Sequence, residues 1–549
     1  MARNPGSSDG TNQLPSTSQT VDTHGGTFVA GNVATGGGDF VGRDKNIFIG
    51  SLPLPRWLAL AILCGLVITV AIAGAIGYQF LPATTMPEGS FNIAVAALNT
   101  IDASGHSVHS DEGYARAEEI ARFIAGQKDT LSEILNKPVE VWGPDRSIPA
   151  LSGQEAYTRA LKLNADTLVF GDLILGQNDR WELVPQFYLA DTAVGQGQEL
   201  LGEYALGNKL TYRPDSTADT GDVNQELNIR IKALVQILRG LSYLTGADSE
   251  SYRKAAAVFQ ETADHSAWAQ LAHHSGQEIL YLFLGNAYLL QAQLTDEAPG
   301  ERGELLIRGQ DAFSQAIALN SAYARPHNGL GSVYFQMARP LEPQDDCDWQ
   351  WGLLDQAATQ FSLALNAAPD QKPPSGQVDL RSYFGLGRVD FWRGFCLDSG
   401  AWDAAEANYQ RVIDDFNHIA NPSPHVTETA ALAHTDLGFM ALQKSEAYRS
   451  SQDATKQAQA AELLDRALGH YRLVFSLLAS SGTAEGVQHG IATMPYLLTA
   501  LCIAGKGEEA EATLDQFVDG MPQSDVTRGR IIERMNVGLW EQCTKRSIS

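Results

Sequence analysis

The side chains best placed to do chemistry are two histidines three positions apart, His106 and His109, with Asp111 and Glu112 close behind. Imidazole and carboxylate groups can ligate a metal ion. Here they follow a Ser-rich stretch with no rigid element to fix them, and metal ligands need such support. The sequence therefore predicts no metal site at this position.

Other signatures of catalysis are missing from the sequence. It contains no HExxH, no GxSxG, no Walker loop, and neither a kinase nor a dinucleotide-binding glycine set. The many carboxylates form no recognisable pair for acid–base work. We therefore expect a protein that is not an enzyme, with no cofactor and no metal.

The cysteines are few, and one of them, Cys64, lies in an apolar segment. The other four are Cys347, Cys396, Cys502 and Cys543. Four cysteines permit three pairings into two bridges, and the sequence leaves the pairing open. It also leaves open that they are ordinary buried thiols.

The charge of the chain is strongly acidic and unevenly placed. The formal net charge is −25, and it lies after residue 81, because the four basic and four acidic residues of 1–56 cancel. A nucleic-acid backbone requires a basic footprint. Nucleic-acid binding is therefore disfavoured.

The apolar segment 57–81, WLALAILCGLVITVAIAGAIGYQFL, has no charged residue. Roughly 20 helical residues span a bilayer core, so it predicts one transmembrane helix. A buried core helix is an alternative, and so is a signal peptide, although the preceding 56 residues exceed a usual n-region. Arg43, Lys45 and Arg56 precede the segment, and Arg116 is the first basic residue after it. This bias predicts a cytoplasmic N-terminus and extracytoplasmic C-terminal domains.

The tail, residues 1–56, is Gly-rich and predicted to be disordered apart from short β repeats at about 26–50. A Phe-Val pair at 28–29 recurs at 40–41. Short strands of this kind could pair with copies on other chains, and a flexible tether is the alternative. The stretch GDFVGRDK, residues 38–45, resembles segments that precede effector or repeat domains in bacterial signalling proteins.

Residues 90–215 alternate strand and helix patterns. Apolar or alternating runs at 91–98, 166–174 and 181–191 predict strands, with helical segments between the first two. This order indicates an α/β sandwich with mixed strand pairing. LNADTLVFG, Leu163–Gly171, and its neighbours resemble the small α/β domain of the TolB amino-terminal and CsgG-like type. The resemblance implies an envelope location and protein–protein assembly.

Residues 222–540 are helical and repetitive. A Leu-Gly-x-x-aromatic pattern begins at Leu284 and Leu330, with weaker copies at Leu386 and Leu437, at intervals of 46, 56 and 51 residues. Each is followed by a second pattern built on Ala and an aromatic or Leu. The second pattern occurs at Ala255–Phe259, Phe313–Ala316, Ala357–Phe361, Ala405–Tyr409, Ala467–Tyr471 and Ala510–Leu514.

These two patterns resemble the tetratricopeptide repeat (TPR). The resemblance implies about six irregular repeats stacked into a superhelical array, with the first helices lining its concave face. A helical bundle without repeats is the alternative.

The groove of such an array would be faced by Asn286, Arg325, Asn328, Arg381 and Arg388. In the TPR family, Asn and basic residues at such positions can clamp a peptide carboxylate through charge-assisted hydrogen bonds. Surface arginines or local ion pairs are the alternative.

The sequence thus predicts a multi-domain chain: a single transmembrane helix, a small α/β domain and an all-α TPR-like array. We expect a membrane-anchored scaffold of the bacterial envelope that binds protein or peptide partners. The span and the tail could also mediate self-association. The alternative is a single-pass sensor that binds a small ligand in the α/β domain and shifts a conformational population through the span.

Overall fold

The computed structural model describes residues 85–546, all within the unit Ala83–Ser549. The description omits 109, 136, 147–152, 177–179, 191–199, 201, 208, 214, 245–247, 266–275, 296–298, 341–346, 369–376, 420–421, 423, 482–483, 520–523 and 536. The predicted tail and the predicted span at 57–81 also lie outside the described residues. Among the helices that are described, none combines the length and apolarity needed to cross a bilayer.

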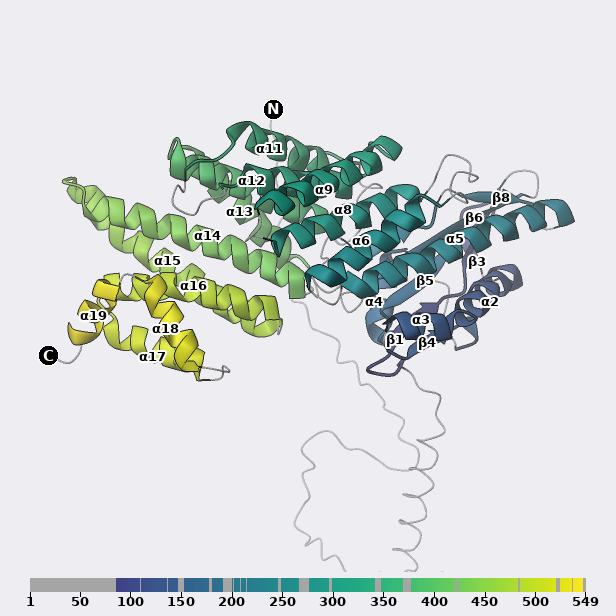
Figure 1. Cartoon of the computed structure of the whole chain (residues 1–549), viewed down its shortest axis with the longest axis horizontal. Coiled ribbons are helices and arrows are strands. Elements are labelled where there is room, and N and C mark those ends of the chain that lie inside the picture. Colours follow the sequence, from purple (N-terminus) through teal and green to yellow (C-terminus); the bar gives the residue numbers. More distant parts are fainter. Residues whose placement is uncertain are drawn as a thin grey trace, which may run out of the picture. The chain divides into compact units, whose positions relative to one another are not determined.

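The described part of the chain begins with a mixed sheet (Figure 1). Its strands are β1 Phe91–Val95, β2 Asn99–Ile101, β3 Ser107–Val108, β4 Val139–Trp142, β5 Thr167–Leu175, β6 Trp181–Leu189, β7 Gly202–Ala205 and β8 Leu210–Tyr212. Strands β4, β1 and β5 are parallel, and β2 pairs parallel with the second half of β5. Strand β6 runs antiparallel along the whole of β5, and β7 and β8 pair with the two halves of β6. The expected α/β region with mixed pairing is confirmed.

The two faces of this sheet are covered by different helices. Ile93, Val169 and Phe187 belong to a core shared with α2 (Asp111–Ala125), α3 (Lys128–Leu135) and α5 (Thr217–Leu244). Because side chains alternate along a strand, Leu168, Phe170 and Tyr188 point to the other face. There they pack with Ala156 and Ala160 of α4 (Gly153–Leu163).

The helical region consists of antiparallel helix pairs that follow one another along the chain (Figure 1). Six pairs are described: α5 with α6 (Ser249–Ala263), α8 (Gln277–Gln293) with α9 (Pro299–Leu319), α10 (Ala324–Ala338) with α11 (Trp351–Leu365), α12 (Gln377–Cys396) with α13 (Ala401–Asn417), α14 (Pro424–Arg449) with α15 (Ala454–Ser481), and α16 (Ala484–Ile503) with α17 (Gly507–Val518). Helices α18 (Ser524–Arg534) and α19 (Val537–Arg546) follow.

Within the pairs, glycines of the first helix lie against an aromatic ring of the second. A Cβ atom added to Gly331 would lie 2.7 Å from the ring of Phe361, and one added to Gly385, on the next first helix, would lie 2.5 Å from the same ring. The same contact joins Gly285 to Phe313 and Gly387 to Tyr409. The sequence patterns therefore mark the sites of closest helix approach.

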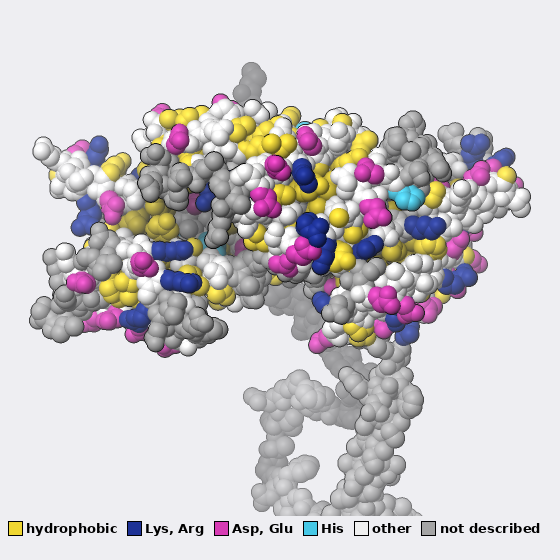
Figure 2. Space-filling model, viewed as in Figure 1, with side chains coloured by type: hydrophobic (Ala, Val, Ile, Leu, Met, Phe, Trp, Pro, Cys, Tyr) yellow, Lys and Arg dark blue, Asp and Glu magenta, His cyan; other side chains and the backbone are white. Residues whose placement is uncertain are grey.

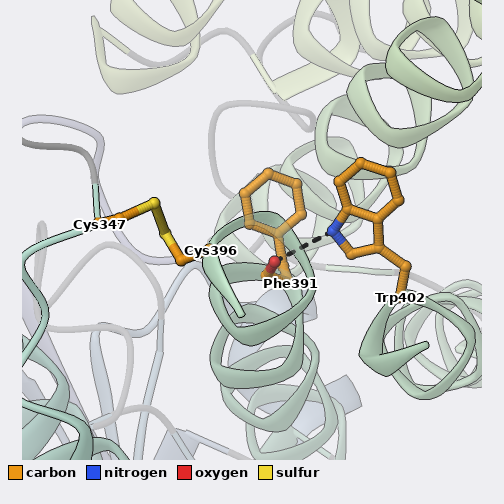
Figure 3. Close-up of a disulfide and its surroundings, with 4 residues drawn as sticks. All are labelled: Cys347, Phe391, Cys396 and Trp402. Atoms are coloured by element: carbon orange, nitrogen blue, oxygen red, sulfur yellow. Dashed lines mark hydrogen bonds between the residues drawn. A yellow bond between two sulfur atoms is a disulfide. The ribbon is translucent and has the colours of Figure 1, made fainter. Parts of the chain in front are cut away.

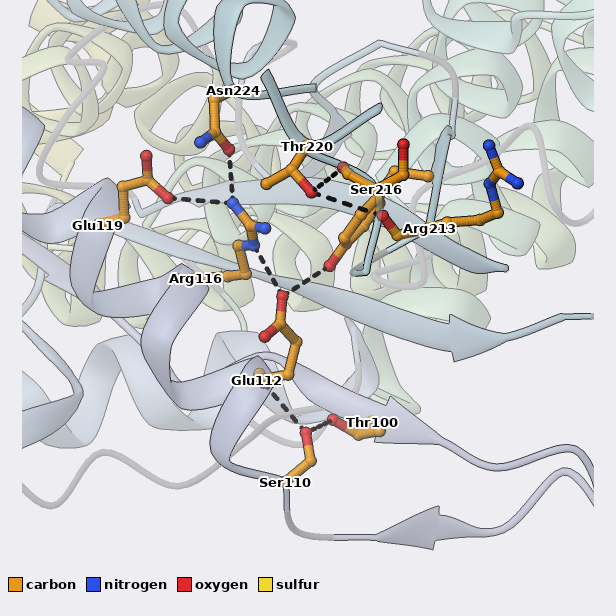
Figure 4. Close-up of polar contacts among 11 residues, drawn as sticks. Thr100, Ser110, Glu112, Arg116, Glu119, Arg213, Ser216, Thr220 and Asn224 are labelled. Atoms are coloured by element: carbon orange, nitrogen blue, oxygen red, sulfur yellow. Dashed lines mark hydrogen bonds and ion pairs between the residues drawn. The ribbon is translucent and has the colours of Figure 1, made fainter. Parts of the chain in front are cut away.

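The sheet and the helix pairs share one hydrophobic core. A single cluster of buried side chains runs from β1 through α5 to Phe313 of α9. Polar contacts reinforce this joint (Figure 4). Arg116 of α2 is only 8% exposed and donates hydrogen bonds to Glu112, at 3.0 Å, and to Asn224 of α5. Glu112 also accepts a hydrogen bond from the hydroxyl of Tyr212 on β8. Helix α5 is therefore both the first helix of the array and a layer of the α/β region.

Two disulfides settle a pairing that the sequence left open. Cys347, before α11, is bonded to Cys396 at the end of α12 (Figure 3). On the same helix, the backbone carbonyl of Phe391 accepts a hydrogen bond from the indole N–H of Trp402. Cys502 of α16 is bonded to Cys543 of α19. Disulfides persist in oxidising compartments. They therefore point to an extracytoplasmic location of this part of the chain.

Three histidines lie between α14, α15 and α16. The Nδ1 atoms of His434 and His470 are 2.9 Å apart, and Nε2 of His489 is 2.9 Å from the Thr435 hydroxyl. Burial lowers the pKa of all three imidazoles, and the pKa values of His434 and His489 fall to about 4. The neighbouring His470 lowers the pKa of His434 further. The charge of Arg466 lowers the pKa of His470 further, whereas the charge of Glu406 raises it. The charge of Glu428 raises the pKa of His489 and so opposes part of the effect of burial. The fold therefore favours neutral imidazoles.

We predict that Gly331→Ala destabilises the array by about 1–3 kcal/mol, because the new methyl group overpacks against a ring held on both sides. Gly469→Ala is the matched control, since a Cβ there meets nothing within 4 Å. The control should be neutral or stabilising by up to about 1 kcal/mol, from helix propensity alone. Urea unfolding of the full chain measures both. Equal effects of the two variants would contradict the close-approach explanation.

We predict that stability falls as pH drops from about 6.5 towards 4, by up to about 3 kcal/mol for each of His434 and His489. The sign follows from lowered folded-state pKa values: below pH 6.5 the unfolded chain takes up protons that the folded chain refuses. His434→Gln should flatten this slope, whereas His418→Gln, exposed at the end of α13, should not. Thermal melts across this pH range test the difference, and parallel slopes in all variants would refute it.

Candidate functional site

One cavity of about 420 Å³ is lined by the first helices of four consecutive pairs. Helix α8 contributes Asn286, α10 contributes Asn328, and α12 contributes Arg381 and Arg388. These helices are neighbours because each ring such as Phe361 packs against two of them. We call this cavity the groove. Four of the five residues predicted from the sequence line it.

Apolar side chains lie between these polar groups. Leu289 of α8, Phe335 of α10, Phe384 of α12 and Leu432 of α14 all line the groove. Leu432 remains 38% exposed, so the groove presents apolar surface to solvent. Binding surfaces commonly combine such apolar area with a few polar groups that orient the ligand.

Arg388 is the cation of the groove whose surroundings the structure describes best. Its guanidinium carbon lies 4.5 Å from the ring centroid of Phe335 and 5.8 Å from that of Phe384. Among the described residues it has no hydrogen-bond or ion-pair partner at contact distance. At longer range it opposes the rise in the pKa of Asp436 that burial causes. A guanidinium carries five donors suited to carboxylates, so Arg388 can receive an anionic group.

The groove is mixed in charge. Arg381 lies seven residues before Arg388, which is about two helical turns on α12. Glu428 of α14 is only 5% exposed and also lines the groove. A ligand therefore meets two guanidinium groups and one carboxylate.

The two asparagines have structural partners. Asn286 donates to the carbonyl of Leu282, one turn back on α8, at 3.0 Å. Asn328 donates to the carbonyl of Val378 at 3.4 Å, and its amide oxygen accepts from Ser382 at 3.2 Å. Asn328 thus ties α10 to α12, and its first effect is on the shape of the groove.

Arg325 lies elsewhere. It is 2% exposed, its guanidinium carbon is 4.1 Å from the ring centroid of Tyr204, and Nη2 donates to the carbonyl of Glu203 at 3.4 Å. Its charge opposes the rise in the pKa of the Glu203 carboxyl that burial causes. The first turn of α10 faces strand β7, which the repeat pattern could not reveal. The structure places Arg325 in the joint between the sheet and the array.

Several groove residues escaped the sequence reasoning. Phe384 lies one turn before Arg388, and Ser332 lies one turn after Asn328, so helical spacing alone could have identified both. Glu428 and Leu432 carried no such signal, because they lie more than one turn before the Leu-Gly pattern of α14 at Leu437.

No cluster suited to a metal ion is found in the part of the chain that the structure describes. His106 is exposed there and contacts the hydroxyl of Ser104, and His109 is outside the described residues.

We predict that Arg325→Met destabilises the full chain by about 2–4 kcal/mol, because it removes a desolvated cation–π contact and leaves Glu203 without its counter-charge. Arg308→Met is the matched control: this arginine is exposed and lies 5.9 Å from the ring centroid of Tyr288. We expect a change within about 0.5 kcal/mol for the control. Urea unfolding measures both, and a small effect at Arg325 would mean that the buried cation does not hold the joint.

No protein-family model matches the chain, and the chain has no significant match among curated proteins. The proposed function therefore depends on the geometry of the groove.

Proposed function

We propose that this chain is a membrane-anchored, non-catalytic scaffold whose helix pairs form a TPR-type array that binds protein partners in the groove. The observation that carries this proposal is the convergence of Asn286, Asn328, Arg381 and Arg388, from three helices, on one cavity. Apolar and cationic groups alternate there. This combination suits a peptide segment with apolar side chains and a carboxylate.

The size of the groove supports a peptide as the ligand. Packed helices lie 8–10 Å apart, so four neighbouring first helices extend over roughly 27 Å. An extended chain rises about 3.3 Å per residue, which allows about eight residues in the groove. Phe384 and Leu432 would contact apolar side chains of the peptide, and Arg388 would pair with a carboxylate.

The membrane anchor is the predicted helix at 57–81, and the described domains would lie on the extracytoplasmic side. The two disulfides support this orientation. The net charge of −25 disfavours nucleic acid as a partner. On the face shown in Figure 2, acidic and basic side chains are intermixed rather than gathered into a basic stripe.

A single-pass sensor remains the second candidate. The observation that favours it is the continuous core between the sheet and the helix pairs. A ligand that shifts one region would thereby act on the other, since a ligand can move an equilibrium when it binds two states differently.

We predict that a benzoylphenylalanine photocrosslinker at Leu432, which lines the groove and is 38% exposed, captures discrete protein adducts in native membranes. Charge reversal of Arg381 and Arg388 to Glu should reduce the yield of these adducts at least tenfold, because the peptide carboxylate loses its partners. Immunoblotting and mass spectrometry of the adducts provide the measurement.

The control places the same crosslinker at Ile307, on the exposed face of α9 and 54% exposed. Adducts shared by both positions would reflect chance encounters. If the groove adducts survive the charge reversal, or if the crosslinker at Leu432 yields none, the groove is not the binding site and the sensor hypothesis gains weight.

A further inference from the structure

A second cavity, of about 510 Å³, lies between α2, α5 and α6. We call it the α5 cavity, and its main lining residues are Phe123, Ile229, Lys232, Val235, Arg239 and Thr262. It shares no residue with the groove. Its volume lies within the roughly 300–1,000 Å³ of small-molecule sites.

The lining of the α5 cavity is apolar on one side. Phe123 comes from α2, and Ile229 and Val235 come from α5. Val235 and Thr262 are buried, and the hydroxyl of Thr262 donates to the carbonyl of Val258 within α6. This side can therefore receive an apolar body, but it offers few donors of its own.

Two cations of α5 also line the cavity. Lys232 and Arg239 are seven residues apart, about two turns, so they lie on the same side of the helix. Neither has an ion-pair partner among the described residues. The Nε–H of Arg239 is shielded from solvent and has no hydrogen-bond partner in the part of the chain that the structure describes. Because Nε is enclosed by protein, a ligand carboxylate would pair with the outer Nη groups of this guanidinium.

One acidic group opposes them. Glu261 of α6, which is exposed, lines the mouth of the cavity together with His265. Two cations against one carboxylate give the cavity a positive balance in a chain of net charge −25.

We propose that the α5 cavity binds a small amphipathic carboxylate. Its carboxylate pairs with Arg239 and Lys232, and its apolar body packs against Phe123, Ile229 and Val235. This site is separate from the groove and goes beyond the scaffold function. Helix α5 covers one face of the sheet and is also the first helix of the array. The ligand therefore contacts the helix that joins the two regions.

The test uses the full chain in lipid nanodiscs and 4-benzoylbenzoate, a photoreactive carboxylate with an apolar body. We expect saturable labelling that maps by mass spectrometry to peptides containing Phe123 or residues 229–235. Arg239→Gln should lower labelling below saturation at least tenfold, and Lys232→Gln several-fold. The uncharged methyl ester should label wild-type protein at least tenfold less.

Two variants serve as controls. Arg308→Gln removes an exposed arginine, and Arg388→Gln changes the groove; both should label as wild type does. The proposal is overturned if the ester labels as well as the acid, if Arg239→Gln and Lys232→Gln leave labelling unchanged, or if the label maps to the groove. The ester comparison needs no variant, so a folding defect of Arg239→Gln cannot obscure the result. The crosslinking test at Leu432 probes the groove separately, so a negative result here does not decide that test.

Discussion

The helical array depends on one steric relation: an aromatic ring of each second helix must lie against backbone that carries no side chain. Phe361 illustrates it, because Gly331 and Gly385 bring two successive first helices onto the same ring. The ring therefore sets both the spacing within a pair and the spacing between pairs. The groove follows from this relation, since its residues come from first helices that the rings have made neighbours.

The joint between the sheet and the array depends on a different set of interactions. Helix α5 covers one face of the sheet with apolar side chains. The buried guanidinium of Arg116 donates to Asn224 of α5, and that of Arg325 lies over Tyr204 of β7. Buried charges are unfavourable unless they are paired. Each of these arginines has carboxylate, carbonyl or aromatic partners from another element, so the joint is specific as well as hydrophobic.

The arginines of this acidic chain thus differ in what they can do. Exposed pairs such as Arg472 with Glu509 contribute little, because solvent screens them. Arg325 is enclosed and structural. Arg388 and Arg239 lie in cavities and have no hydrogen-bond or ion-pair partner at contact distance among the described residues. Partly shielded guanidinium groups in cavities are suited to receive a ligand carboxylate. Burial and partners, rather than residue type, separate these roles.

The sequence by itself determined the local features: the strands of the α/β region, the paired helices, and the Gly and aromatic positions where they touch. These follow from periodicity and side-chain size, which act between residues near in the chain. Only the tertiary structure decided which cysteines pair, and that Arg325 faces β7 while Asn328 faces the groove. It also decided that Glu428 and Leu432 line the groove. The reason is physical: each of these depends on which distant elements become neighbours, and a helix pattern specifies a face without specifying what will cover it.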